Sequence, residues 1–293
     1  MYTNVLEFLV DLLNQSEGCL DSKCRKEVAA PLIEFTDVFA ASDDNLGRTS
    51  IVKHKINNGT IKQATRHLPL KNGSRKGSGE DAEKWGIEQS SSPWSSTVVL
   101  VKKKDGTTRF CIDFRKVNYM LSKDAFCYPG CKTLQMDFLA GSTWFLTLDL
   151  KSGYWQVEVE NEDRPKTAFT MGSGLRKFCV MPFGLVNAPA TFERLMEHVL
   201  AGLLPELCLI YLGDLIIHVK RFQDELKNLR KLERLIAASR TKARYKEVST
   251  FPKPYIYIYI LLETHYRRGG GLSTDLVKVQ TVAEWPTPQT VPK

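Results

Sequence analysis

The sequence has no apolar run long enough to cross a membrane, which would need about 20 consecutive apolar residues. Cys127 and Cys131 are joined by no second cysteine pair or histidine cluster, which argues against a zinc site. Seven cysteines, an odd number, suit a reducing compartment. Glu7 and Asp11 interrupt the first apolar run, so it predicts an amphipathic helix rather than a signal peptide. We therefore expect no membrane partner and take the cytoplasm as the default location.

Acidic residues are also too few to balance the basic ones. The chain carries 41 Lys and Arg against 33 Asp and Glu, a net charge of +8. This balance favours a polyanionic partner, nucleic acid first, although a basic enzyme of another kind has the same composition. A length of 293 residues allows one large domain or two ordinary ones, and leaves the oligomeric state unknown.

The first third of the chain has few strand signals. Apolar spacing predicts a helix over residues 3–15 and a second over 24–40, interrupted by Pro31. Residues 41–92 are polar, and their Gly/Ser/Lys tract at 72–80 predicts a loop.

Strand signals dominate from residue 93 onward. "PWSSTVVLVKKKDGTTRFCIDF" predicts a hairpin with a basic Asp-Gly tip. Further strands are expected over 143–150, 154–160, 167–171 and 177–181, helices over 189–203 and 222–238, and a hairpin over 209–218. Strands interleaved with helices in this way indicate an α+β fold.

Residues 239–271 show no sustained periodicity except a strict Tyr-Ile alternation. A repeated TA dinucleotide in the gene would encode that alternation, so we favour a genomic insertion or frame slip. The alternative is a short strand. Regular patterning returns after residue 271.

Two aspartates stand where predicted strands meet open space. Asp149 ends "FLTLDL", and Asp214 lies at the turn of "LIYLGDLIIH". Two carboxylates on adjacent strands suit Mg²⁺, which takes oxygen ligands and substrate phosphate. The alternative is two unrelated turn acids, because 65 residues separate them and spacing alone does not decide.

The order of several long motifs identifies a family. These are "EFTDVFA", "SSSPWSSTVVLVKKKDGTTRFCIDFRKVN", "LAGSTWFLTLDLKSGYWQVEVENEDRPKTAF", "VMPFGLVNAPATFERLMEHVLAGL", "LIYLGDLIIH" and, more weakly, "KVQTVAEWPTPQTV". Together they resemble the reverse transcriptase domain of a gypsy-type LTR retrotransposon Pol polyprotein, here as a degenerate copy. The resemblance implies a right-hand polymerase fold with fingers and palm and a truncated or degraded thumb. It also implies Mg²⁺, an RNA template, a DNA primer or RNA–DNA hybrid, and dNTPs.

The resemblance assigns roles by position. Asp149 and the Leu150 carbonyl would be metal ligands, together with Asp214. Tyr154 would stack under the incoming sugar and reject a 2′-hydroxyl, and Phe183 would line the nucleotide pocket beside it. The alternative for Tyr154 is a place in the core.

The hairpin would hold the triphosphate. Arg109, with Lys103 or Lys104, takes this role by the resemblance, and cations of this kind neutralise phosphate charge. The alternative is that the "KKKD" segment is a solvated turn.

One departure from the family changes the expected activity. The family motif Tyr-x-Asp-Asp is here Tyr211-Leu212-Gly213-Asp214, so Gly213 occupies the position of a bridging acid. We therefore expect an RNA-directed DNA polymerase by family that is catalytically impaired in this copy. The alternatives are a non-catalytic nucleic-acid-binding remnant or repurposed module, and an active polymerase that uses Asp149 and Asp214.

The domain organisation expected from these patterns has four parts. Residues 1–60 form a helical segment upstream of the polymerase, and 61–238 form the fingers and palm. Residues 239–271 are degenerate and irregular, and 272–293 are a remnant of the region that follows the palm.

Overall fold

The computed structural model describes residues 22–39, 46–58, 86–102, 106, 108–126, 142, 144–150, 152–171, 174–211, 214–250, 256–258, 264–267, 271–274 and 280. The helix expected over residues 3–15 and the loop at 72–80 lie outside them. Among the helices so described, none has the length and apolar character needed to cross a membrane.

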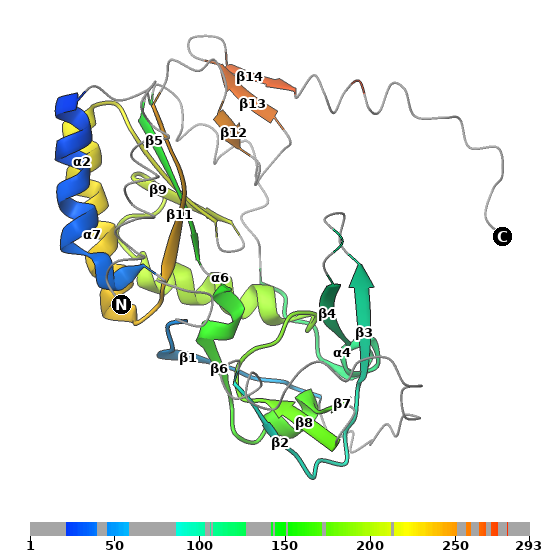
Figure 1. Cartoon of the computed structure of the whole chain (residues 1–293). Coiled ribbons are helices and arrows are strands. Elements are labelled where there is room, and N and C mark those ends of the chain that lie inside the picture. Colours follow the sequence, from blue (N-terminus) through cyan, green and yellow to red (C-terminus); the bar gives the residue numbers. More distant parts are fainter. Residues whose placement is uncertain are drawn as a thin grey trace.

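A four-stranded sheet organises the upper half of the molecule (Figure 1). Its order is β11 (Ala243–Thr250), β5 (Trp144–Leu150), β10 (Asp214–Val219) and β9 (Cys208–Tyr211), with every neighbouring pair antiparallel. The predicted strand over 143–150 and the 209–218 hairpin are confirmed as β5 and β9–β10.

Both faces of this sheet are covered. Leu215, Ile216 and Ile217 are consecutive in β10, so their side chains point to alternate faces, yet each is at most 2% exposed. Figure 1 shows α2 (Ser22–Glu34) and α7 (Phe222–Ser239) side by side along one side of the sheet.

The two long helices form where the sequence places apolar stripes. In α7, Leu226, Leu229, Leu232 and Ile236 recur at helical spacing and are at most 6% exposed. In α6 (Ala188–Val199), proline lies at the second position, where a missing N–H costs no helical bond. Both predicted helices are confirmed, although α6 ends at Val199 and not at residue 203.

Smaller sheets make up the lower half of Figure 1. β1 (Thr49–His54) pairs in parallel with β6 (Val157–Val159). β8 (Gly174–Phe178) lies between β2 (Ile87–Gln89) and β7 (Phe169–Met171). Short 3-10 turns, η1 (Thr36–Val38), η2 (Gly153–Gln156) and η3 (Arg164–Thr167), connect the elements.

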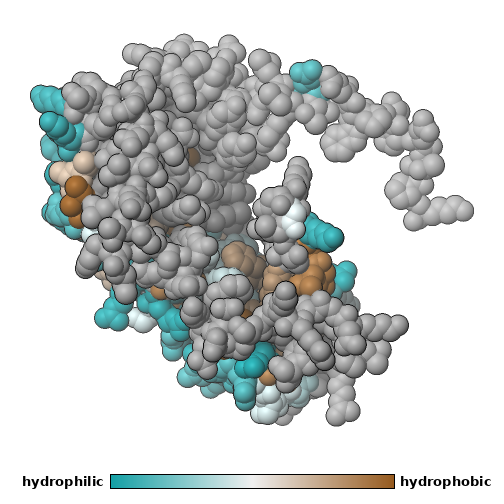
Figure 2. All heavy atoms as spheres, viewed as in Figure 1, coloured by the Kyte–Doolittle hydropathy of each residue, from teal (hydrophilic) through white to brown (hydrophobic). Residues whose placement is uncertain are grey.

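A separate hairpin rises beside these sheets. β3 (Thr97–Lys102) pairs with β4 (Thr108–Asp113), and α4 (Arg115–Met120) follows at once. The predicted hairpin is confirmed. Figure 2 shows hydrophobic side chains over it, and Val99, Leu100 and Val101 are 42–48% exposed.

The expected irregularity of residues 239–271 is wrong for the part described there. β11 adds to the edge of the central sheet, and β12 (Ile256–Ile258) and β13 (Thr264–Arg267) form a small sheet with β14 (Gly271–Thr274). The pairing of β11 shifts by one residue between Tyr245 and Glu247. Such a bulge breaks period-2 alternation, so the sequence pattern hides the strand.

Two expectations for the N-terminal region also differ. Residues 1–60 are not wholly helical, because β1 lies within them. Pro31 does not end the helix, which continues to Glu34 with Phe35 N donating to Pro31 O at 3.0 Å. Proline removes one N–H donor but leaves its own carbonyl available to the next turn.

The strands expected over 154–160 and 177–181 are shifted. Residues 153–156 form η2, which begins after Ser152 in the left-handed region (φ 46°), and only 157–159 are strand. β8 ends at Phe178. The α+β class itself is confirmed.

Candidate active site

The pairing of β5 with β10 brings Asp149 and Asp214 directly opposite each other. Residues opposite one another in an antiparallel pair share a face of the sheet, with Cβ atoms about 4.5–5.5 Å apart. Asp149 is the penultimate residue of β5 and Asp214 is the first of β10, so both lie at one end of the sheet. Their backbone positions are described, whereas their side chains, and Gly213 altogether, lie outside the description.

The same register extends this row across the whole sheet. Arg244 of β11 is the partner of Asp149 on its other side, and Tyr211 of β9 is the partner of Asp214. The row therefore reads Arg244, Asp149, Asp214, Tyr211. Arg244 could not be predicted from the sequence, because the bulge in β11 leaves no periodic signal around it.

The donors at this edge fit a hard divalent cation by their chemistry. Two carboxylates and the carbonyl of Leu150 are oxygen ligands of the kind Mg²⁺ takes. No group of three or more His, Cys, Asp or Glu that could hold a metal occurs among the described residues, a set that excludes both aspartate side chains.

An aromatic cluster follows Asp149 in the chain. The Tyr154 ring lies 5.0 Å from that of Phe183 and 5.3 Å from that of Phe192, centroid to centroid. Trp155 contacts Phe183 at 5.8 Å. Phe183 is 53% exposed, whereas Phe192 is buried. The cluster thus forms a half-open aromatic surface with Tyr154 between solvent and core.

A close approach of backbone to ring holds Tyr154 in place. A Cβ on Gly153 would lie only 2.5 Å from Cζ of Phe192, so the chain passes the ring where only glycine fits. Packing of η2 against α6 therefore sets the position of the Tyr154 ring relative to Phe192.

Asn118 of α4 holds the loop that carries Phe183. Its Nδ2 donates to Gly184 O at 2.7 Å, and its Oδ1 accepts from Val186 N at 2.9 Å. Gly184 has φ +96°, which favours glycine. Asn118 could not be predicted from the sequence, because a single asparagine on a short helix gives no signal of a distant partner.

The proposed triphosphate ligands are only partly described. Arg109 lies in β4 opposite Val101, and its side chain is outside the description, as are Lys103 and Lys104 altogether. Whether they approach Tyr154 stays a prediction.

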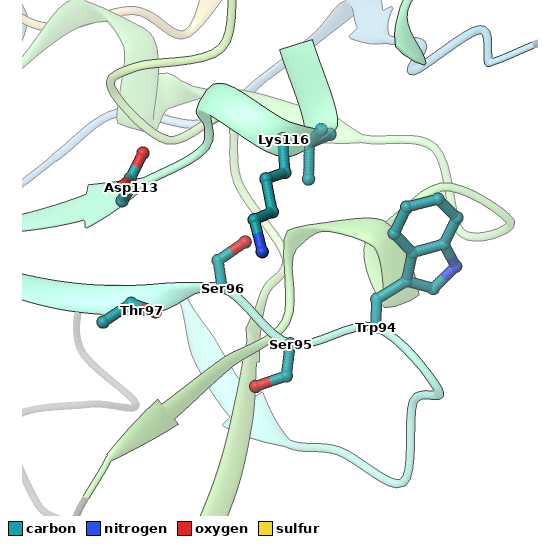
Figure 3. Close-up of a pocket in the computed structure, with 7 residues that line it drawn as sticks. Trp94, Ser95, Ser96, Thr97, Asp113 and Lys116 are labelled. Atoms are coloured by element: carbon teal, nitrogen blue, oxygen red, sulfur yellow. The ribbon is translucent and has the colours of Figure 1, made fainter. Parts of the chain in front are cut away.

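A small cavity lies at the base of the hairpin (Figure 3). Trp94, Ser96, Asp113 and Lys116 line it, and the Lys116 amine points toward Ser96. Its volume of about 40 Å³ suits a few water molecules and is too small for a nucleotide. Asp113 is engaged by Arg115, whose Nε and Nη2 donate to it at 2.9 and 2.7 Å.

Comparison with known proteins connects this geometry to a family. Residues 101–255, just over half of the chain, match the family model described as reverse transcriptase (RNA-dependent DNA polymerase). The chain is 30% identical over 210 residues to the retrovirus-related Pol polyprotein from transposon opus of Drosophila melanogaster, covering 70% of this chain and 20% of that protein. It therefore spans about a fifth of that polyprotein's length.

A shorter relative and solved structures agree. The RNA-directed DNA polymerase homolog of Oenothera berteroana is 42% identical over 125 residues, which are 42% of this chain and 87% of that protein. The foamy viral protease-reverse transcriptase in complex with double-stranded DNA superposes with a TM-score of 0.82 at 18% identity, covering 97% of this chain and 49% of that one. A structure of that protein in complex with an RNA/DNA hybrid superposes with a TM-score of 0.76. The expected polymerase fold is thereby confirmed, and the chain belongs to the reverse transcriptase family, as a reverse transcriptase domain of LTR-retrotransposon type.

Proposed function

We propose that this chain is the RNA-directed DNA polymerase domain of a retrotransposon polyprotein and that Gly213 impairs its catalysis. The observation that carries the proposal is the opposition of Asp149 and Asp214, with glycine as the residue before Asp214. Its partners would be an RNA template, a DNA primer and dNTPs. The nucleic acids in the related foamy viral structures support the first two.

Each residue has a separate task in this proposal. Asp149, Asp214 and the Leu150 carbonyl would hold Mg²⁺, which when bound supplies charge stabilisation to phosphoryl transfer. Tyr154 would form the floor under the deoxyribose, and Phe183 would close the side of that pocket, as their 5.0 Å ring contact allows. Arg109, with Lys103 or Lys104, would neutralise the triphosphate.

The loss at Gly213 is large in energetic terms. Outer-shell partners of a metal site are worth about 10–100-fold in affinity or activity, and a ligand itself is worth more. We expect the missing carboxylate to cost on the order of 4 kcal/mol, or about a thousandfold in rate. Glycine adopts the backbone conformations of a hairpin turn without strain, so we expect the loss of activity without a loss of stability.

Primer extension on an RNA template with Mg²⁺ tests this proposal. The unmodified chain is compared with Gly213→Asp and with Gly213→Asp/Asp149→Asn. We expect weak extension by the first, extension about a thousandfold faster by the second, and loss again in the third.

Other results would overturn the proposal. Robust extension by the unmodified chain would mean that Asp149 and Asp214 suffice. No extension by folded Gly213→Asp would place the defect outside the turn, as expected for a non-catalytic remnant.

A further inference from the structure

An open pocket lies away from the Asp149–Asp214 row of the sheet, on the surface between β1, α6 and the segment after α4. Its volume is about 410 Å³. Four cationic side chains line it: Lys53, Lys55, Lys123 and Arg194. Asp124 is the only carboxylate among its described lining residues.

The charges do not cancel. Arg194 is paired with Asp124 through both of its terminal nitrogens, so this pair is neutral. Lys53 lies 3.9 Å from Glu158, a long contact between partly exposed groups that is worth little. Lys55 and Lys123 are exposed, and among the described residues neither has a carboxylate partner. The pocket is therefore a net cationic surface.

Hydrogen bonds hold in place the segment just after β1, residues 55–57, which forms one wall of the pocket. Ile56 N donates to Asp163 Oδ2 at 2.8 Å, and Lys166 Nζ donates to Ile56 O at 2.6 Å. Ser122 N donates to Asn57 O at 3.0 Å, which joins this wall to the segment after α4. Lys55 and Lys123 thus project from backbone that is fixed on both sides.

Asn187 fixes the opposite wall. Its Nδ2 donates to Ser122 O at 2.8 Å, and its Oδ1 accepts from Asp124 N at 3.0 Å. Beneath the pocket, the buried ring of His54 is hydrogen-bonded to Thr191 at 2.9 Å. A pocket whose walls are preformed in this way loses little entropy on binding.

One helix joins this pocket to the aromatic cluster. Asn187, immediately before α6, and Thr191 and Arg194 within it recur at helical spacing and line the pocket. Phe192 on the neighbouring stripe contacts Tyr154. The pocket and the aromatic cluster therefore use neighbouring stripes of one helix.

We propose that this pocket binds the phosphate backbone of single-stranded nucleic acid, namely the unpaired part of the template. The occupant is indicated by charge complementarity on a chain of net charge +8. Lys55 and Lys123, which have no carboxylate partner in the part of the chain that the structure describes, lie there among neutral amide and hydroxyl groups. The choice of the template strand rests on the proposed polymerase function, whereas the binding itself does not require catalysis.

Fluorescence anisotropy with a labelled single-stranded RNA, in the absence of dNTPs and Mg²⁺, tests this assignment. Lys55→Gln/Lys123→Gln is compared with Lys227→Gln/Lys231→Gln, which removes the same charge from the exposed face of α7. We expect the first pair to weaken binding roughly tenfold and to reduce the salt slope by about 1.4, at about 0.7 per lost contact. The α7 pair should change affinity less than about twofold.

Three outcomes would overturn the proposal. They are equal losses in the two variants, an unchanged salt slope, or competition by poly-glutamate that matches competition by unlabelled RNA. Thermal unfolding of each variant checks folding, because exposed substitutions of this kind shift stability by only about 0.5 kcal/mol. Failed primer extension would contradict the proposed polymerase function. The proposed binding of RNA in the pocket is tested only by the difference in affinity between the two variants.

Discussion

Asp149 of β5 and Asp214 of β10 are direct cross-strand partners at one end of the central sheet. The two residues are 65 positions apart in the sequence, and the antiparallel pairing of β5 with β10 brings them together. The pairing of β10 with β5 is continuous from Asp214 to Val219. A shift of this pairing by one residue would turn every side chain of β10 to the other face of the sheet. Such a shift would also separate Asp214 from Asp149, so the register of β5 with β10 sets the positions of the two acids.

Replacing Tyr154 should alter sugar selection. In the Gly213→Asp background, we expect Tyr154→Val to lower discrimination against ribonucleotides by at least about tenfold, because the aromatic floor is lost. Incorporation of dNTPs and rNTPs in parallel measures this ratio. Tyr119→Val, at a side chain 92% exposed, is the matched control and should leave the ratio unchanged. An unchanged ratio in Tyr154→Val would remove the residue from the nucleotide pocket.

Gly153 should not tolerate a side chain. Gly153→Ala places a Cβ 2.5 Å from Cζ of Phe192, and we expect a loss of about 1–3 kcal/mol in unfolding free energy. Urea unfolding measures the loss. Phe192→Leu should relieve part of it, so a double-mutant cycle should show favourable coupling. Purely additive effects would argue against the contact.

Gln156 should control the attachment of β11. Its buried amide accepts from Lys242 N at 2.6 Å and donates to Lys242 O at 2.9 Å. Gln156→Leu leaves both backbone groups unpaired, at a cost of about 2–4 kcal/mol. Hydrogen exchange across residues 243–250 should accelerate first. Gln223→Leu loses one exposed bond to Glu27 and should shift stability by only about 0.5 kcal/mol.

Stability should fall in acid because of His54. Burial lowers the pKa of His54 to about 4, against 6.5 for an ordinary histidine. Asp163 and Asp124 oppose this shift, and Arg194 adds to it. The unfolded chain binds a proton at His54 more readily than the folded chain does. The contribution of neutral His54 to the free energy of unfolding is therefore full above pH 6.5 and declines as the pH falls toward 4. Over this range, protonation of His54 lowers the free energy of unfolding by about 3 kcal/mol.

Unfolding by urea at several pH values checks this slope. His54→Gln should flatten it between pH 6.5 and 4. His198→Gln, at an exposed position on α6, should leave it as it is. An equal slope in all three proteins would assign the acid sensitivity to other groups.

Elements whose stabilising contacts are local could be predicted from the amino-acid sequence. The apolar stripes of α6 and α7 and the β3–β4 and β9–β10 hairpins follow from spacings within a few residues, and the order of the motifs specified the family. The same motifs supplied Asp149, Asp214, Tyr154 and Phe183 as candidate site residues, and their roles stay predictions.

Elements that depend on backbone groups distant in the chain could not be predicted in this way. β11 joins the sheet through hydrogen bonds to β5, and its bulge hides it from any periodic pattern. The parallel pairing of β1 with β6 has no local signal either, because strand partners more than a hundred residues away supply its bonds. Asn118, Gln156 and the lysine-lined pocket act through contacts with residues remote in the chain. A backbone group bonds to whichever partner the fold brings near, so these features exist only once the chain has folded.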